Sequence, residues 1–303
     1  MRETVKQARW RSLTFLLFSA VIIALFFIPL LSLYRFSVND ETFTYIPLVP
    51  FISGFLIFQR RKEIFTGVTG SLIPGVVLVS IGIALYVVGS MKGSAWNPAG
   101  RHSIMAISAV ACFAGGVGIC FGSRALTAAE FPLAFLLFMA PFPPAILDPI
   151  MQFLQRWSAE AADILFRVSS IPVFRDKFVF SLPGITIEVA KECSGIRSSL
   201  SLFLLSLLSG HLYLRTGWAK TVLCIAVIPI TIIKNAVRIF TLTALAVYVD
   251  PRILGSVAHQ RGGIPIFFLA LVLFGSVLWA LRILERGGKK LLTPGNTEHA
   301  DTV

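Results

Sequence analysis

Three residues of this chain carry side chains that together could perform acyl transfer. Cys193 stands in the sequence ECSGIR, residues 192–197, where a long polar segment gives way to an apolar run. Arg238 lies inside a later hydrophobic segment, and His259 lies in the short stretch that follows it. A thiol nucleophile, an imidazole that moves protons and a cation that stabilises negative charge are the parts of a cysteine acyl-transfer site. This chemistry requires all three residues to meet at one membrane face.

Residues beside the thiol and the guanidinium are expected to support them. A serine and a glycine after the thiol let the backbone approach closely, and the positive N-terminal end of the following helix would stabilise a thiolate. Lys234 lies one helical turn before Arg238, on the same face. The expected supporting or substrate-binding residues are Ser194, Gly195, Arg197, Lys234 and Asn235.

Each of the three residues also has a plainer interpretation. An isolated cysteine is commonly a buried, inert thiol, and a surface histidine is commonly only solvated. An arginine in a membrane segment costs about 2.5–3.5 kcal/mol, so Arg238 should face a partner or a polar cavity. Its long side chain could instead extend to the external headgroups. The sequence alone leaves these alternatives open.

The other thiols and the histidines do not suggest a metal or a cofactor. Cys112, Cys120 and Cys224 fall within apolar segments, where a free cysteine behaves as a small hydrophobic residue. Cysteines and histidines nowhere have the spacing of zinc ligands, and no Walker-type loop or Gly-x-Ser-x-Gly sequence occurs. We therefore expect no metal site and no cofactor.

The composition predicts a polytopic membrane protein. Of 303 residues, 56% are hydrophobic and only 14% are charged, and the mean hydropathy is +0.82. The formal net charge of +12 does not predict nucleic-acid binding, because the basic residues mostly flank apolar runs, as membrane anchors do. We expect one integral membrane domain, residues 1–290, and a short polar cytoplasmic tail, residues 291–303.

Repeated apolar runs of about 20 residues, the length that crosses a bilayer, predict about eight membrane-spanning helices in an all-α fold. Lysine and arginine are more frequent in alternate short loops, which places both termini in the cytoplasm and residues 148–192 outside. The apolar N-terminal run has no small-residue cleavage site, so it is expected to remain as the first span. The expected spans are 13–33, 43–58, 71–91, 103–122, 127–147, 197–214, 218–248 and 264–284.

The external segment 148–192 is expected to contain an amphipathic helix and a small β-hairpin. Residues 177–181 and 185–189 alternate in polarity around Pro183-Gly184, a turn signal. Before them, apolar residues recur at helical spacing, as in a helix that lies in the membrane interface. That apolar face comprises Ile150, Phe153, Leu154, Trp157, Ala161, Ile164, Leu165 and Val168. The opposite face comprises Gln152, Gln155, Arg156, Glu160, Asp163 and Arg167.

The chain resembles the exosortase/archaeosortase family of membrane cysteine transpeptidases. Three segments carry the resemblance, in the family's order: residues 188–197 (EVAKECSGIR), residues 235–239 (NAVRI) and His259. Two positions depart from the family pattern, because Glu192 stands where a small residue is expected and Gln260 where an aspartate is expected. These departures leave the three candidate catalytic residues in place.

The resemblance implies a function and partners. Cys193 matches the family's nucleophile, Arg238 its arginine and His259 its histidine. Such an enzyme cleaves the C-terminal sorting signal, of the PEP-CTERM type, from membrane-anchored precursor proteins through a cysteine thioester. It then transfers the protein to a surface acceptor such as a glycan or exopolysaccharide. The expected location is the cell membrane, with the active site at its external face and the lipid bilayer as a partner.

Two interpretations from other classes compete with this one. A transporter or a lipid-linked-sugar handling protein could use Lys234 and Arg238 to bind an anionic group, but it would have no use for Cys193. A structural subunit of an envelope assembly would not depend on any of the three candidate catalytic residues.

Overall fold

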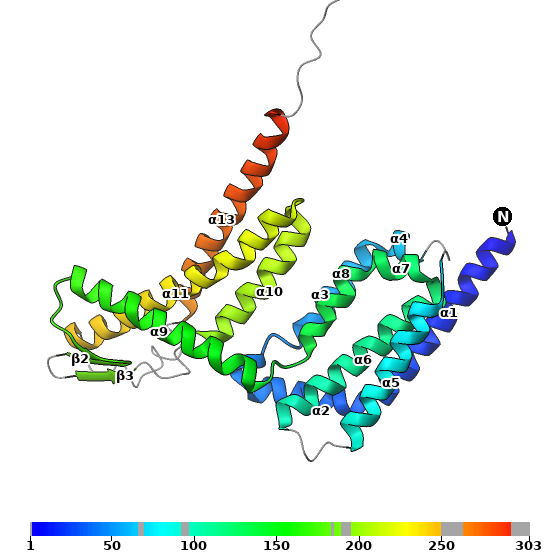
Figure 1. Ribbon diagram of the computed structural model, residues 1–303, viewed down its shortest axis with the longest axis horizontal. Coiled ribbons are helices and arrows are strands. Elements are labelled where there is room, and N and C mark those ends of the chain that lie inside the picture. The colour runs from blue at the N-terminus through cyan, green and yellow to red at the C-terminus, as the bar shows by residue number, and fades with distance from the viewer. Residues whose placement is uncertain are drawn as a thin grey trace, which may run out of the picture. The chain divides into compact units, whose positions relative to one another are not determined.

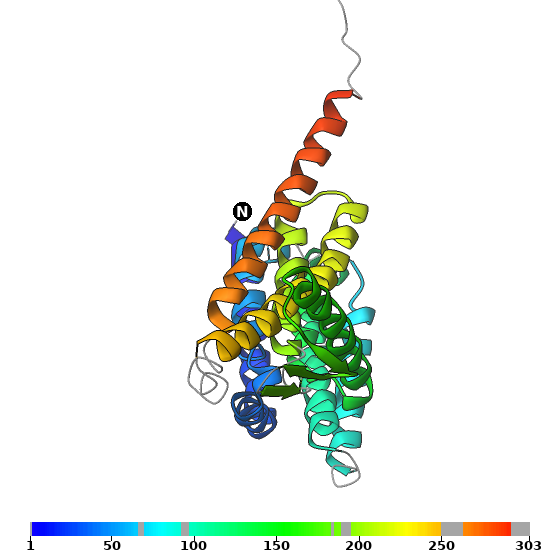
Figure 2. The same ribbon diagram turned by 90° about the vertical axis from the view of Figure 1, so that its left-hand side faces the viewer.

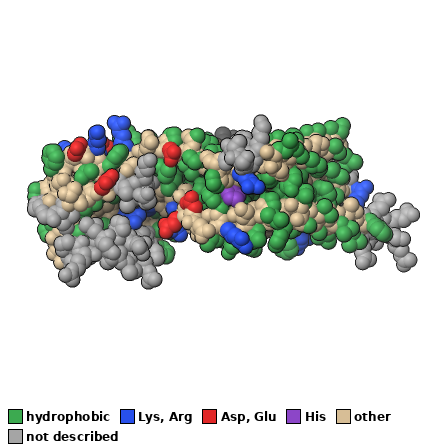
Figure 3. Space-filling model, turned by 90° about the horizontal axis from the view of Figure 1, so that it is seen from below, with side chains coloured by type: hydrophobic (Ala, Val, Ile, Leu, Met, Phe, Trp, Pro, Cys, Tyr) green, Lys and Arg blue, Asp and Glu red, His purple; other side chains and the backbone are tan. Residues whose placement is uncertain are grey.

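The structure is a computed structural model, and its helices, with one small sheet, confirm an all-α polytopic membrane protein. Figure 3 shows a face on which hydrophobic side chains predominate and charged ones are few. The chain divides into two compact units, Met1–Leu147 and Asp148–Val303, which are described in turn. The described residues are 2–65, 70–91, 97–182, 185–188, 195–249 and 263–291.

The first unit is helical and is built around the pair α5 and α6, which lie side by side in Figure 1. Glycines at every seventh position of α5, Gly75 and Gly82 among them, contact α6, where Gly115 and Gly118 face α5. Ser108 donates to the Gly82 carbonyl at 2.7 Å. Small residues let the two backbones approach closely, a common way for membrane helices to pack. The elements are α1 (Arg2–Leu25), α2 (Phe27–Asn39), η1 (Glu41–Phe43), α3 (Leu48–Gln59), α4 (Arg61–Phe65), α5 (Ile73–Met91), α6 (Pro98–Phe121), α7 (Ser123–Ala128), α8 (Glu130–Leu136) and η2 (Leu137–Met139).

Two expected spans are not single straight helices. The first expected span is broken at Phe26, where α1 and α2 meet at 62°. Pro29 is the cause we assign, because proline cannot donate to the carbonyl four residues earlier and its ring clashes with that carbonyl. The expected span 127–147 is also wrong as one helix. It ends at η2, and after three prolines in residues 141–144 the chain continues in α9 (Pro144–Val168), bent by 87° from α8.

The number of spans stays a prediction. Within the described residues, five helices are long and apolar enough to cross a membrane, or seven if each bent pair counts as one span. The predicted sixth span is present as α10 (Ile196–Tyr213), an 18-residue helix that is not among those five. Its apolar run is interrupted by five serines: Ser198, Ser199, Ser201, Ser206 and Ser209.

In the second unit, α10, α11 (Gly217–Tyr248) and α13 (Gly263–Leu291) pack around a common apolar core that includes Leu202, Leu223 and Phe274. Figure 1 and Figure 2 show α13 running beside α11. The Glu285 carboxylate on α13 accepts a hydrogen bond from the Thr216 amide at 2.8 Å and from the Arg215 amide at 3.1 Å. Because the first amides of a helix lack intrahelical partners, this carboxylate fixes the start of α11.

The amphipathic helix is confirmed as α9, although its polar side is not wholly exposed. Apolar side chains are exposed along one face, including Phe153, Trp157 and Ile164. Gln155 and Asp163, which were expected on the solvent side, are only 6% and 7% exposed. The prediction is wrong for these two residues because Ala159 and Ala162 on the same side pack in one cluster with Ala236 of α11. Such small side chains bring α9 close to its neighbours and cover the polar residues between them.

The β-hairpin is confirmed and is extended by a strand that the sequence did not predict. β2 (Val179–Leu182) pairs antiparallel with β3 (Ile185–Glu188), with Leu182 opposite Ile185. The Pro183-Gly184 turn itself lies outside the described residues. A third strand, β1 (Phe174–Asp176), precedes β2 and pairs with it. A two-residue turn, Lys177 and Phe178, joins β1 to β2. Lys177 has a φ of +53° without being glycine, asparagine or aspartate, so the usual turn signal is missing.

Candidate active site

One face of α11 carries a run of polar residues in its second half. Thr231, Lys234, Asn235 and Arg238 recur at spacings of three and four residues, so they share a face of the helix. Lys234 is 5% exposed, Thr231 and Asn235 are fully buried, and Arg238 is partly buried. Burying a lysine ammonium in an apolar helix is unfavourable unless polar groups surround it. This face of α11 therefore marks a polar site inside the second unit.

The start of α10 provides those polar groups. Gly195 is the residue before α10 and has a φ of +75°, in the left-handed region that favours glycine. A Cβ atom on Gly195 would lie 3.2 Å from the Lys234 Nζ and 3.4 Å from the Asn235 Oδ1. Glycine is needed here for its backbone conformation and for the close approach of α11. The structure thus joins the ECSGIR segment to the NAVRI segment, which are about 40 residues apart in the sequence.

Ser198, in the first turn of α10, completes what we call the buried polar cluster: Gly195, Ser198, Lys234 and Asn235. The Lys234 ammonium donates a hydrogen bond to the Ser198 hydroxyl. The sequence analysis missed Ser198, because a serine next to other serines on an apolar helix carries no distinguishing pattern. Its position one turn after Gly195 is the only signal that could have indicated it.

The predicted site residues have different outcomes. Gly195, Lys234 and Asn235 are brought together, and Arg238 lies one turn beyond Lys234 on the same helix face. Arg197 is exposed and does not belong to the buried polar cluster. The predicted site residues outside the described residues are Cys193, Ser194 and His259.

The other three cysteines are described and are free thiols. Cys112 is buried beside Phe26 and Ala109, and Cys224 accepts a hydrogen bond from the Ser206 hydroxyl at 3.4 Å. Within the described ranges, no group of three or more His, Cys, Asp or Glu side chains could hold a metal ion.

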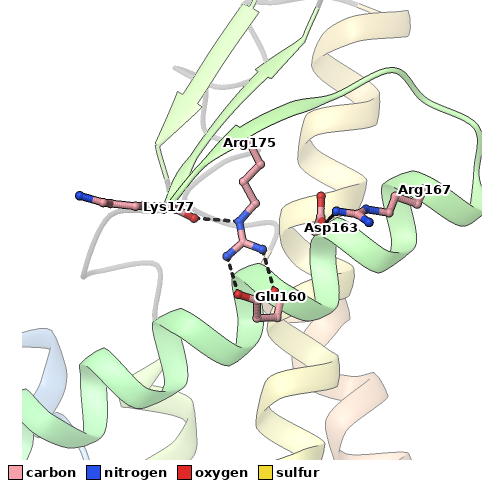
Figure 4. A network of polar contacts seen from close by, with 5 residues as sticks. All are labelled: Glu160, Asp163, Arg167, Arg175 and Lys177. Carbon is pink, nitrogen blue, oxygen red and sulfur yellow. Dashed lines mark hydrogen bonds and ion pairs between the residues drawn. The ribbon is translucent and has the colours of Figure 1, made fainter.

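A charged pair ties the sheet to α9. Figure 4 shows the Arg175 guanidinium between β1 and α9, where two of its nitrogens donate to the Glu160 carboxylate at 3.0 Å each. Its Nε donates to the Lys177 carbonyl at 2.8 Å, and the guanidinium lies 5.5 Å from the centre of the Phe180 ring. The hydrogen bonds from Arg175 lower the pKa of the Glu160 carboxyl. A two-pronged arginine–carboxylate contact fixes geometry better than a single bond.

Aromatic rings continue this connection to α11. The buried rings of Phe166 on α9 and Phe180 on β2 lie 5.5 Å apart, and Phe166 lies 5.2 Å from Phe240 on α11. Phe240 follows Arg238 by two residues. The sheet whose last strand leads toward Cys193 is therefore packed against the helix that carries Arg238 and Lys234.

The Arg175–Glu160 pair predicts a measurable loosening of the sheet. Arg175→Ala should speed hydrogen exchange of the β1–β3 amides about 2–5-fold, since a partly exposed charged pair contributes roughly 0.5–1 kcal/mol. Arg167→Ala is the matched control, because Arg167 pairs with Asp163 within α9 and its side chain is 76% exposed. Equal exchange rates in both variants would show that the pair does not hold the sheet.

The same pair predicts how the sheet responds to acid. Because the folded-state pKa of Glu160 is lowered from its usual 4.5, the pair stabilises the sheet fully above that value. This stability should be lost as the pH falls below 4.5 through the lowered pKa. Glu160→Gln should remove this acid-dependent loss of protection in β1–β3, measured as exchange rates divided by the intrinsic rates at each pH.

The fold and the site describe an integral membrane protein that buries one lysine ammonium among polar groups where α10 begins. A family model described as transmembrane exosortase matches residues 37–276, which is most of the chain and includes all three candidate catalytic positions. The chain belongs to the transmembrane exosortase family, a family of membrane cysteine transpeptidases that act in protein sorting. No curated protein and no solved structure matches the chain.

Proposed function

We propose that this protein is a membrane cysteine transpeptidase that removes the C-terminal sorting signal of exported precursor proteins. Cys193 forms a thioester with the precursor, and the precursor is then transferred to an acceptor on the cell surface, such as a glycan or exopolysaccharide. The substrates are membrane-anchored precursors with a short motif, one transmembrane helix and a basic end. The site faces the outside of the cell membrane, and both termini lie in the cytoplasm.

The observation that carries this proposal is the contact between the two segments that hold the candidate nucleophile and arginine. Gly195, which follows Cys193 by two residues, meets Lys234 and Asn235, and Arg238 lies one turn further on. Two peptide units span at most about 7 Å, so the chain keeps the Cα atom of Cys193 within about 7 Å of Gly195, the residue that the Lys234 ammonium approaches. A nearby cation favours the thiolate, which is the reactive form of cysteine. Membership of the exosortase family supports the same chemistry.

The reaction has two stages. In the first, the Cys193 thiolate attacks the carbonyl carbon of the scissile peptide bond, and the negative charge on the carbonyl oxygen is stabilised by Arg238. When the C–N bond breaks, His259 gives a proton to the departing amine and the acyl group stays on sulfur. In the second stage, His259 removes a proton from an acceptor amine or hydroxyl, which attacks the thioester and releases Cys193 as the thiolate.

The supporting residues are proposed to position the segment that carries Cys193 and to place positive charge beside it. Gly195 allows α11 to approach, while Lys234 and Asn235 provide a positive charge and an amide next to the nucleophile's segment. Ser194 and Arg197 belong to that segment, and Arg197 is exposed. The exposed aromatic face of α9 suits a helix at the membrane interface, which would hold the sheet and the nucleophile at that depth.

The burial of Lys234 also favours a second candidate function, the binding of an anionic group by a transporter or a lipid-linked-sugar handling protein. Among the described residues, the Lys234 ammonium donates to the Ser198 hydroxyl, and no carboxylate forms a salt bridge with it. A bound phosphate or carboxylate would supply the missing negative charge. This alternative assigns no chemistry to Cys193.

Modification of the thiol distinguishes the two functions. The protein would carry alanine at Cys112, Cys120 and Cys224, so that Cys193 is the only thiol. A membrane-impermeant maleimide added to intact cells should then stop removal of the C-terminal anchor from the precursor. Continued processing after complete modification of Cys193 would reject the proposed enzyme and leave the anion-binding alternative.

A further inference from the structure

Ser198 connects the buried ammonium of Lys234 to the backbone at the start of α10. The hydroxyl accepts a hydrogen bond from the Lys234 ammonium and donates one to the Gly195 carbonyl at 2.9 Å. An uninterrupted series of hydrogen bonds therefore runs from the charge on α11 to the residue at which α10 begins. Hydrogen bonds to charged groups are stronger than neutral ones, and consecutive bonds strengthen each other at low dielectric.

The Lys234 ammonium lies at the start of α10, and the N-terminal end of a helix is already positive. The aligned peptide dipoles of α10 are equivalent to roughly half a positive charge at that end. Lys234 is 5% exposed, so water screens its charge little. The hydroxyl of Ser198 keeps this second positive charge beside the first turn of α10.

We infer that Ser198 is a positioning residue for acyl transfer: it holds the Lys234 ammonium at the start of α10, where the ammonium stabilises the negative charge that develops during the reaction. This inference rests on the proposed function, and it adds a residue and a role to it. Arg238 and Lys234 then act from successive turns of α11, with Lys234 fixed through Ser198. A group that acts only on developing charge should change the rate of the bound complex and leave the affinity for the precursor unchanged.

Ser199 offers a matched control within the same helix turn. Its hydroxyl also donates to the Gly195 carbonyl, at 2.8 Å, and it is a serine on the same apolar helix. In the described part of the chain, the Ser199 hydroxyl bonds the Gly195 carbonyl, and the Lys234 ammonium bonds Ser198 instead. If the two serines serve only to donate to the Gly195 carbonyl, their replacement by alanine should have equal effects.

The experiment measures processing of a purified precursor in proteoliposomes as a function of precursor concentration. Ser198→Ala should lower kcat about ten-fold at unchanged KM, which is the scale of one hydrogen bond to a charged group. Ser199→Ala should stay within about two-fold, and Ser198→Thr, which keeps the hydroxyl, should restore most of the rate. Lys234→Gln combined with Ser198→Ala should be no slower than Lys234→Gln alone, because the serine acts through the lysine.

The same assay separates the failure of this inference from the failure of the proposed function. If Cys193→Ala is inactive while Ser198→Ala and Ser199→Ala have equal kcat, this inference is overturned and the proposed function stands. The inference would also be overturned if the double variant lost kcat by the product of the factors measured for Ser198→Ala and Lys234→Gln alone. Processing by Cys193→Ala would overturn the proposed function, and the inference with it.

Discussion

Cys193→Ala is expected to abolish processing of the precursor while the protein still accumulates in the membrane. The reason is that the proposed mechanism forms the acyl intermediate on Cys193. Cys193→Ser should be nearly as inactive, because a hydroxyl ionises far less readily than a thiol at neutral pH. The measurement is the rate at which the precursor loses its C-terminal anchor, normalised to the amount of enzyme in the membrane.

The remaining thiols provide the controls for that experiment. Cys120→Ala and Cys224→Ala should keep normal activity per molecule, since both thiols lie within helices and have no part in the proposed reaction. Cys112→Ala should also stay active but accumulate less, because Cys112 is buried in the contact between α6 and α5. Processing that survives in Cys193→Ala would remove the nucleophile assignment altogether.

Arg238→Lys is expected to leave the protein folded and inserted but to slow acylation of Cys193 about 10²–10³-fold, roughly 2.7–4 kcal/mol of transition-state stabilisation. Guanidinium presents a planar fork of donors that can hold an oxyanion, whereas the lysine ammonium is a compact point charge. If Arg238 only extended to the headgroups, lysine would serve equally well. Single-turnover loss of the precursor's anchor, followed at matched enzyme levels, measures the effect.

Lys234 provides the comparison on the same helix face. Lys234→Arg and Lys234→Gln should both be milder than Arg238→Lys, because Lys234 acts on the surrounding charge while Arg238 contacts the reacting oxygen in the proposed mechanism. A wild-type rate in Arg238→Lys would make Arg238 a membrane anchor. If Lys234→Gln slowed acylation more than Arg238→Lys does, Lys234 rather than Arg238 would be the residue that contacts the reacting oxygen.

The general fold could be predicted from the sequence because bilayer thickness and strand alternation leave few choices. Apolar length predicts helices such as α5 and α11, and alternation around a two-residue turn predicts the pairing of β2 with β3. The helix breaks were missed because hydropathy measures how apolar a segment is and not whether its backbone can continue as one straight helix. Pro29 and the prolines of residues 141–144 are apolar, so they do not interrupt an apolar run, although they interrupt the backbone hydrogen bonds.

The site was predictable only in part, for related reasons. Lys234 and Arg238 stood out because charges are rare inside apolar segments, and Gly195 because it follows a cysteine at a helix start. Ser198 could not be distinguished from the other serines of α10, because its role depends on which face of the helix meets Lys234. Gln155 and Asp163 were misplaced for the same reason: helical periodicity identifies an apolar face but does not determine which side another helix covers.

The central claim is that Cys193 carries the precursor as a thioester, and direct isolation of that intermediate tests it. The enzyme and a labelled precursor would be mixed without acceptor, quenched in acid to preserve the thioester, and analysed by mass spectrometry of the peptide containing Cys193. The account predicts that the Cys193 peptide gains the mass of the precursor's cleavage-site peptide minus one water, as an acyl group on sulfur. This adduct should be sensitive to hydroxylamine and absent from Cys193→Ala. An unmodified Cys193 during active processing, or an adduct on another residue, would contradict it.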